Sequence, residues 1–285
     1  GYRLDAVKHI DMTWLTDLRQ QVSQKVASSQ QAFYMVGETF TNNKGLLKQY
    51  IDPASKLDGQ FDFPLRAELV KVILMRQGTF YDLHNFLNAN EGYYGAGAIM
   101  GTFIGNHDLP RSIHLAEDNP QFGSWDSGKS RAWNNLPVQP NYDKPYQRMG
   151  VAFTALMTLP GIPLIYYGDE VGLAGGGDPD NRRPMPWSGN NAHQTALKAH
   201  LTKLNKIRAS HPALRYGARA QHWVANDVYA YSMTHGADKL VVVLNRSDSS
   251  QSIFLPGSSY KDLLSGKTVS ASGVTVPARS SMVLE

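Results

Sequence analysis

The segment GYRLDAVKH, residues 1–9, decides the fold because it has the pattern of a strand that ends in charged side chains. Side chains alternate between the two faces over Tyr2–Val7, as in a strand with an apolar face. Trp14–Ala27 follows with apolar side chains at helical spacing. Arg3 and Asp5 share one face of such a strand, because successive side chains point to opposite faces. The opening of the chain therefore predicts a strand followed by a helix.

The same alternation of strand and helix continues along most of the chain. Strands that are each followed by a helix are typical of a parallel sheet covered by helices, so we predict an α/β fold. The further strands are expected at Ala32–Gly37, Gly59–Phe63, Ala98–Ile104 and Pro163–Tyr167, and the further helices at Lys44–Tyr50, Arg66–Met75, Thr79–Asn88, Gln147–Thr158 and Ala192–Arg208.

The last part of the chain has a different sequence pattern, in which short β-rich segments are separated by Gly, Asn, Asp and Ser turns. This pattern predicts a small antiparallel β domain. We place the domain boundary after residue 211, which gives an α/β domain over 1–211 and a β domain over 212–285. Its strands are expected to include Val228–Met233, Leu240–Leu244 and Val274–Val276.

The composition excludes several classes of protein. A hydrophobic share of 42% and a charged share of 18% are ordinary for a folded globular chain. The net charge of +4 is modest and its cations are scattered, so we expect no nucleic-acid partner. Prolines and a glycine interrupt the longest apolar stretch, Phe153–Tyr167, so we expect no membrane span. The chain has no cysteine for a disulfide or thiolate site, which leaves its compartment open. A secreted or periplasmic location is favoured over a cytoplasmic one.

Single acids stand at the ends of three predicted strands: Asp5, Glu38 in FYMVGETF, and Asp108 in FIGNHDLPR. Arg3 should keep the pKa of Asp5 low, whereas apolar neighbours should raise the pKa of Glu38. Taken singly, each has a structural alternative: an Arg–Asp pair that braces the interior, a capping or surface glutamate, and a structural histidine at His107. Functional groups gather at this edge of such sheets, so the three together favour a site.

An ionised carboxylate beside a protonated one is the arrangement of glycoside hydrolysis. With the two carboxyl groups about 5 to 5.5 Å apart, one attacks the anomeric carbon and the other protonates the leaving oxygen, so configuration is retained. A third acid can stabilise the positive charge that develops on the sugar ring.

These motifs resemble those of the α-amylase family of glycoside hydrolases, family 13. GYRLDAVKH looks like the family's fourth-strand motif, GETF like the fifth and FIGNHD like the seventh, in the family's order. GIPLIYYGDEVGL resembles the eighth strand, DPDNRRPMPW the loop after it, and the tail the family's C-terminal β-sandwich. The resemblance therefore implies a (β/α)8 TIM barrel of which strands 4 to 8 are in this chain, followed by a β-sandwich.

The resemblance also implies roles for individual residues. It makes Asp5 the nucleophile, Glu38 the acid/base and Asp108 the transition-state stabiliser. Substrate-binding positions follow at Arg3, Lys8, His9, His107, Asp178 and Arg182, and the His9 backbone carbonyl matches a calcium ligand. Asp169 and Glu170 are interpreted as a structural turn. An N-terminal segment or separate chain is expected to supply the barrel strands that are not in this sequence.

The expected activity is hydrolysis of α-1,4-glucosidic bonds in starch or maltodextrins through a covalent glycosyl-enzyme intermediate. Cyclomaltodextrinase, neopullulanase, oligo-1,6-glucosidase and transglycosylase activities use the same carboxylates and stay open. An inactive carbohydrate-binding homologue is the alternative from another class. The run GLAGGG, 172–177, raises a phosphate or nucleotide site, but it has no Walker lysine, which favours a flexible loop.

Overall fold

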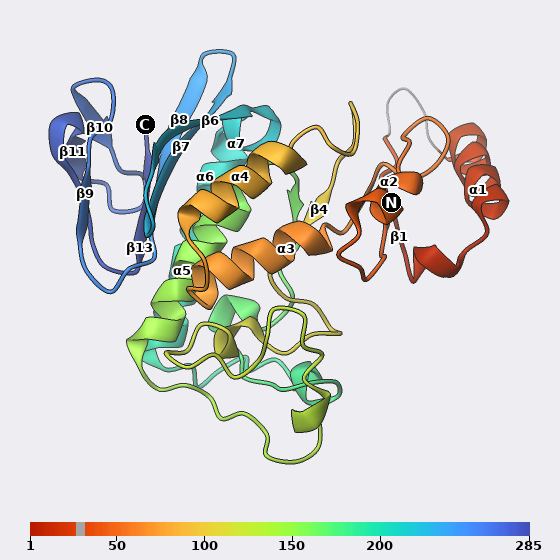
Figure 1. The fold of residues 1–285 in the computed structure, drawn as a ribbon, viewed down its shortest axis with the longest axis horizontal. Helices are drawn as coiled ribbons and strands as arrows, with labels where there is room; N and C mark the ends of the chain where they lie inside the picture. The colour runs from red at the N-terminus through yellow and green to blue at the C-terminus, as the bar shows by residue number, and fades with distance from the viewer. Residues whose placement is uncertain (27–31) are drawn as a thin grey trace. The chain divides into compact units, whose positions relative to one another are not determined.

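The computed structural model describes residues 1–26 and 32–285 as two compact units (Figure 1). One unit comprises residues 1–66, 86–103 and 161–164, and the other comprises 67–85, 104–160 and 165–285. None of the helices that the structure describes is long and apolar enough to cross a membrane. The β-rich tail belongs to the same unit as the two long helices before it, so the boundary after residue 211 stays a prediction.

Short parallel strands form the centre of the first unit, in the order of the sequence. Each strand pairs with the next, and a single parallel bridge from Phe61 to Gly101 continues the ladder between the third and fourth. In the described part of the chain this sheet does not close into a barrel. The parallel order that the sequence predicts is confirmed. The strands are β1 (Tyr2–Leu4), β2 (Met35–Gly37), β3 (Gly59–Gln60), β4 (Gly101–Thr102) and β5 (Ile162–Pro163).

All five strands are shorter than predicted, because the backbone leaves the ladder after two or three residues. At β1 the cause is visible: Ala6 adopts the left-handed region with φ of 45°, and the chain turns into the 3-10 helix η1 (Val7–His9). A non-glycine residue in that region costs free energy, so the surrounding contacts must hold it.

The predicted helices are confirmed, although their ends differ and Ala27 lies outside the described residues. Side chains of Asp11 and Asn43 accept backbone N–H groups at the starts of two helices, and Asn191 forms a capping box with Gln194. The helices are α1 (Met12–Lys25), α2 (Lys44–Gln49), α3 (Phe63–Leu69) with a π-helical extension η2 (Val70–Leu74), α4 (Phe80–Asn90), α5 (Asp143–Thr158), α6 (Ala192–Ser210) and α7 (Ala213–Tyr216).

The C-terminal segment is antiparallel, as predicted. A four-stranded sheet in the order β13-β8-β7-β6 shares a core of Val, Ile, Leu and Ala side chains with the pair β9-β12. Consecutive residues of β7 and β8 are buried, so both faces of these strands are covered, which is why they read as apolar runs. The strands are β6 (Ala218–Val224), β7 (Val228–His235), β8 (Asp238–Asn245), β9 (Gln251–Ile253), β10 (Ser259–Lys261), β11 (Thr268–Ser270), β12 (Val274–Val276) and β13 (Ser280–Leu284).

Helix α5 joins the two parts of the second unit, because it contacts both α6 and the strands β8 and β13. Nearly all of its side chains are buried, including Phe153 and the charged Arg148, which are 0% exposed. The Arg148 guanidinium binds the Ala116 carbonyl at 2.8 Å, Asp118 at 2.8 Å and Asp248 at 3.2 Å. Asp248 follows β8, so this ion-pair cluster connects the β-rich tail to the helix.

Candidate active site

Two predicted catalytic carboxylates of the first unit meet at one arginine. The Arg3 guanidinium lies 2.5 Å from Asp5 through Nη1 and 2.7 Å from Glu38 through Nη2. The Asp5 side chain is 72% exposed, whereas that of Glu38 is 9% exposed. The structure therefore gives the two acids a common cation but very different access to solvent.

The backbone fixes this arrangement. Leu4 of β1 lies opposite Gly37 of β2 in the parallel ladder, so the residues that follow each of them leave the sheet side by side. Two further hydrogen bonds extend the pairing: Glu38 N donates to the Leu4 carbonyl at 2.9 Å, and Val7 N donates to the Glu38 carbonyl at 2.8 Å. Both the backbone N–H and the backbone carbonyl of Glu38 are therefore hydrogen-bonded.

The surroundings of Glu38 are less apolar than the sequence suggests. Met35 is buried, but Phe40 is 39% exposed and packs edge-on against Phe63 with ring centroids 4.8 Å apart. Arg3 is a charged partner of Glu38, and its guanidinium favours the ionised carboxylate while burial favours the neutral one. The raised pKa expected for Glu38 stays a prediction.

Lys8 and His9 lie on η1, directly after the turn at Ala6. The Lys8 Nζ donates to the Phe40 carbonyl at 3.3 Å, so this side chain points toward the segment that carries Glu38. His9 is exposed, and its backbone N–H closes the turn by donating to the Ala6 carbonyl at 2.9 Å.

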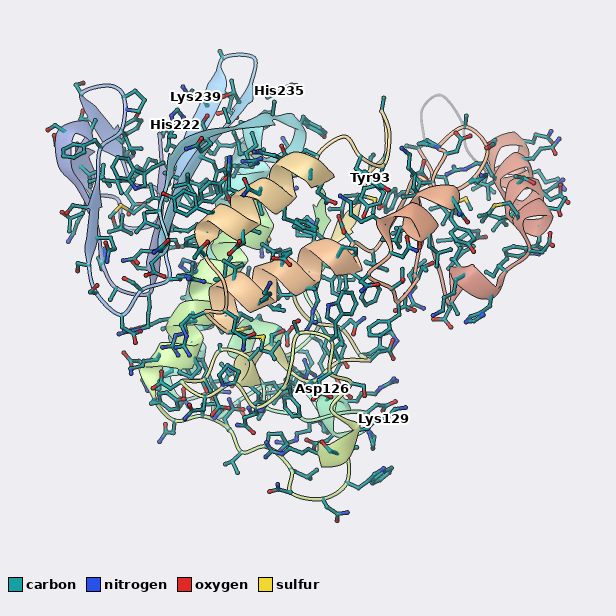
Figure 2. The ribbon with its side chains drawn as sticks, viewed as in Figure 1. Tyr93, Asp126, Lys129, His222, His235 and Lys239 are labelled. Carbon is teal, nitrogen blue, oxygen red and sulfur yellow. The ribbon has the colours of Figure 1, made fainter. Side chains whose placement is uncertain are left out.

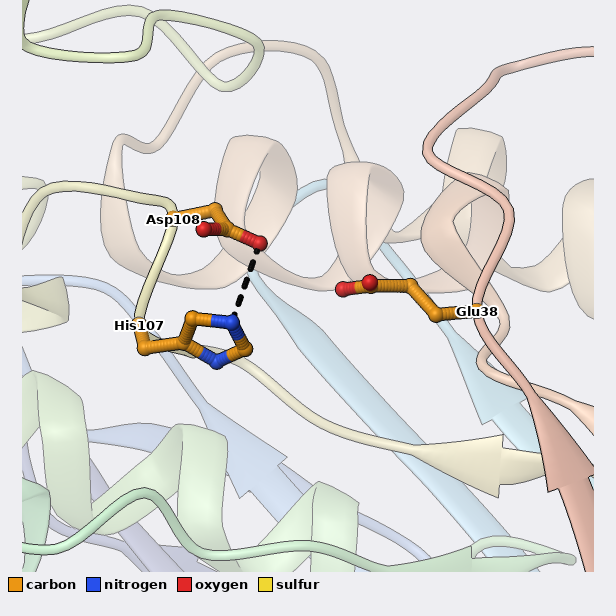
Figure 3. A group of neighbouring side chains, drawn as sticks. All are labelled: Glu38, His107 and Asp108. Atoms are coloured by element: carbon orange, nitrogen blue, oxygen red, sulfur yellow. Dashed lines mark ion pairs between the residues drawn. The ribbon is translucent and has the colours of Figure 1, made fainter. Parts of the chain in front are cut away.

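The second unit gathers the other predicted residues. His107 Nε2 lies 3.3 Å from Asp108 Oδ2 (Figure 3). Arg182 lies 3.7 Å from the other oxygen of Asp108 and 3.1 Å from Asp178. Asp108 and Arg182 are each 44% exposed at the side chain. Figure 3 also shows the Glu38 side chain extending from the segment after β2. The predicted site residues therefore lie in two groups, one in each unit.

The glycine run 172–177 has a packing explanation. A Cβ on Gly176 would lie 2.0 Å from the Arg131 carbonyl oxygen, and one on Gly177 would lie 2.5 Å from the Gly128 carbonyl oxygen. The backbone of the loop that carries Asp126 and Lys129 (Figure 2) thus approaches too closely for any side chain. These glycines are required by close backbone contact, and the contact does not call for a phosphate.

Asp169 is buried, as a structural turn requires. It begins the 3-10 helix η5 (Asp169–Val171), and its carboxylate lies 3.3 Å from Arg111, a guanidinium that is itself 1% exposed. The Arg111 guanidinium also stacks over the rings of Tyr166 and Tyr167 at 4.2 and 4.8 Å. The buried Arg111 side chain therefore holds the segment after β5 in place.

Two asparagines near Asp108 were not among the predicted site residues. Asn106 Oδ1 accepts the backbone N–H of Asp108 at 3.0 Å, and the buried Asn181 donates through Nδ2 to the carbonyls of His107 and Leu109 at 2.8 and 2.9 Å. Asn106 belongs to the motif FIGNHD, so its place was visible. The sequence carries no periodic signal for Asn181, because the loop around it follows no regular element.

Comparison with known families agrees with the strand-end motifs. The family model for the α-amylase catalytic domain matches residues 1–222, which is most of the chain. The chain belongs to the α-amylase family. A second model, for the β-galactosidase C-terminal domain, matches residues 234–285 in the antiparallel part of this α-amylase family member.

Relatives of this family member include both glucan transferases and amylases. A cyclomaltodextrin glucanotransferase from Niallia circulans is 31% identical over 273 residues, which cover 93% of this chain and 33% of the relative. A solved Anoxybacillus α-amylase is 25% identical with a TM-score of 0.80, covering 100% of this chain and 58% of that one. An acarbose complex of a Geobacillus thermoleovorans α-amylase has a TM-score of 0.78 at 23% identity, covering 100% of this chain and 59% of that one.

The chain thus spans about a third of the curated transferase that it matches. The likeness to the two amylase structures supports the α-amylase catalytic fold with a C-terminal domain, which is the coarser form of the sequence-based expectation.

Proposed function

We propose that this chain contributes the catalytic carboxylates of a retaining glycoside hydrolase that cleaves α-1,4-glucosidic bonds in starch or maltodextrins. One observation carries the proposal: the Arg3 guanidinium holds Asp5 and Glu38 together at the ends of neighbouring parallel strands. Retaining enzymes need two carboxyl groups close together on either side of the scissile bond, and a shared arginine supplies this proximity.

In the proposed reaction, Asp5 attacks the anomeric carbon while the bond to the leaving oxygen breaks. Glu38 gives its proton to that oxygen, so the products are a glycosyl ester on Asp5 and a shortened glucan. Glu38 then removes a proton from water, whose oxygen attacks the same carbon and displaces the Asp5 carboxylate. The Arg3 guanidinium stabilises the negative charge of the Asp5 carboxylate before the first step and after the second. Asp108 stabilises the positive charge that develops on the sugar ring.

The accessible charged groups suit a polyhydroxylated substrate. Asp178, Arg182 and His107 are proposed to bind hydroxyls of the sugars next to the cleaved bond, and Lys8 and His9 those on the leaving side. The exposed positions of these side chains support hydrogen bonding to a ligand from solvent.

A second candidate is transglycosylation, in which a sugar hydroxyl replaces water in the second step. The 31% identity to a cyclomaltodextrin glucanotransferase favours it. Cyclomaltodextrinase, neopullulanase and oligo-1,6-glucosidase activities need the same carboxylates and differ in linkage and length. An inactive carbohydrate-binding role is less favoured, because the three acids are all present and two of them, Asp5 and Glu38, directly follow parallel strands.

Three further expectations remain proposals. A segment or chain outside residues 1–285 completes the barrel, which is supported by the open parallel sheet and by the share of the relatives that is matched. The protein is secreted or periplasmic. Calcium binds with the His9 carbonyl as one ligand; since calcium takes six to eight oxygen ligands, this single donor does not make a site by itself, and no catalytic step depends on it.

The test is release of reducing sugar from soluble starch by the full-length protein, with Glu38→Gln as the inactive control. Glu38→Gln keeps the size of the side chain and removes the acid, so we expect activity to fall by about 1,000-fold or more. Chromatography of the products separates the two candidates, because cyclic or lengthened glucans indicate transfer and linear short ones indicate hydrolysis. Equal activity of parent and Glu38→Gln refutes the assignment.

A further inference from the structure

Asp108 lies in a turn beyond the end of the strand β4. The strand β4 ends at Thr102, and the Asp108 side chain is 44% exposed at the tip of the turn. Its own backbone N–H is bound by Asn106 at 3.0 Å. A carboxylate that must meet a developing charge needs a fixed backbone, because small misplacements of a catalytic group can cost about 100-fold in rate.

Asn181 holds this turn from the buried side. Its Nδ2 group donates at 2.8 Å to the carbonyl of His107 and at 2.9 Å to that of Leu109. Both hydrogens of one amide are thus used on the carbonyl groups of the two residues on either side of Asp108. The Asn181 side chain is 0% exposed, so water does not compete for these bonds.

The amide of Asn181 is not an obvious choice for stability. Its Oδ1 atom is buried and has no hydrogen-bond partner among the described residues, and a buried acceptor without a partner is destabilising. A residue that keeps this cost has a reason to keep its donor group, and in the described part of the chain that group donates to the carbonyls of His107 and Leu109, on either side of Asp108.

Asn181 is itself held rigidly. It lies in the 3-10 helix η6 (Asp180–Arg182), whose first residue, Asp180, is buried and accepts the Gly176 N–H at 2.7 Å and the Arg183 guanidinium at 2.8 Å. The next residue, Arg182, reaches the Asp108 carboxylate at 3.7 Å. One short helix therefore contacts both the backbone and the side chain of the Asp108 turn.

We propose that Asn181 is a positioning residue that sets the Asp108 carboxylate by binding the backbone carbonyls of the residues on either side of it, His107 and Leu109. The role rests on the proposed glycosidase function for its kinetic consequence, but the contact itself is independent of that function. Asn181 acts through Asp108 and does not touch the reacting atoms.

The test uses Asn181→Ala and the matched control Asn245→Ala in the full-length protein. Asn245 is also fully buried and also binds loop carbonyls, those of Ser249, Val276 and Pro277, but in the β-rich tail. We expect Asn181→Ala to lower kcat by about 10- to 100-fold with KM changed less than about threefold, while Asn245→Ala keeps kcat. Equal kcat losses in both variants overturn the inference.

Hydrogen exchange measured by mass spectrometry separates this inference from the proposed function. Asn181→Ala should speed exchange in the peptide covering 104–111, and Asn245→Ala should not. A parent protein without glycosidase activity sinks the proposed function, yet the exchange result still decides whether Asn181 holds the turn. Unchanged exchange in that peptide overturns the inference. If Asn181→Ala does not fold, Asn181→Leu, which is close in volume, removes both donors without adding a charge and is held to the same outcomes.

Discussion

Replacing Asp118 by asparagine tests whether the ion-pair cluster on α5 stabilises the second unit. The hydrogen bond from the buried Arg148, followed by that from Lys144, lowers the pKa of Asp118 from its ordinary 3.8 to about 2. The full difference would correspond to about 2 kcal/mol. Because the Asp118 side chain is 45% exposed, solvent screening reduces this to about 1 kcal/mol. Asp248 stays near Arg148 at 3.2 Å, so the guanidinium keeps a partner.

The pH dependence follows from the sign of the shift. A carboxyl whose pKa is lowered by folding contributes stability above its unfolded pKa, and the contribution is lost as the pH falls through the folded value. For Asp118 it is complete above about pH 5, roughly half remains near pH 3, and little remains near pH 2. The difference between parent and Asp118→Asn should shrink over the same range.

Urea unfolding followed by tryptophan fluorescence measures the effect. At pH 7 the midpoint of Asp118→Asn should lie about 0.3 to 0.5 M below that of the parent. Asp17→Asn, an exposed acid on α1, is the control and should leave the midpoint unchanged. Superposed curves at pH 7 for parent and Asp118→Asn, or a difference of constant size down to pH 3, would refute the reasoning.

Two further changes test the site and the loop beside it. Arg3→Lys replaces a fork that contacts two carboxylates by a single ammonium, so we expect kcat on starch to fall by about 10- to 100-fold, and an unchanged kcat would contradict the shared-cation arrangement. Gly176→Ala places a methyl group 2.0 Å from the Arg131 carbonyl oxygen and should lower the thermal midpoint by several degrees. The control Gly123→Ala, whose Cβ meets its nearest atom at 3.9 Å, should not lower it. Equal midpoints for the two variants would show that the loop can move away.

Much of the parallel fold could be predicted because its signal is local. The apolar run before Glu38 and the helical spacing after Trp14 depend on neighbouring residues, and both elements were found near the expected positions. Strand ends were less predictable, since the left-handed turn at Ala6 depends on contacts from β2 that no pattern in β1 contains.

Contacts between distant segments could not be predicted. Arg148 binds Asp248, which lies 100 residues away in the sequence, and Asn181 binds the carbonyl of His107, which is 74 residues away. Alternation and helical spacing say which face of an element is buried but not which loop covers it. The contact between Arg3 and Glu38 could be predicted in part. The sequence placed both residues on predicted neighbouring strands, but only the structure showed one guanidinium between two acids.

The position of β13 has a consequence for how the protein is made. This strand, Ser280–Leu284, pairs with β8 and contacts α5, and the Ser281 hydroxyl meets Thr154 of α5 at 2.7 Å. During synthesis α5 leaves the ribosome more than a hundred residues before β13 does. The side of α5 that β13 covers therefore stays exposed until β13 has been synthesised. Folding of the second unit then depends on this late-synthesised strand and on protection of the exposed helix from aggregation in the meantime.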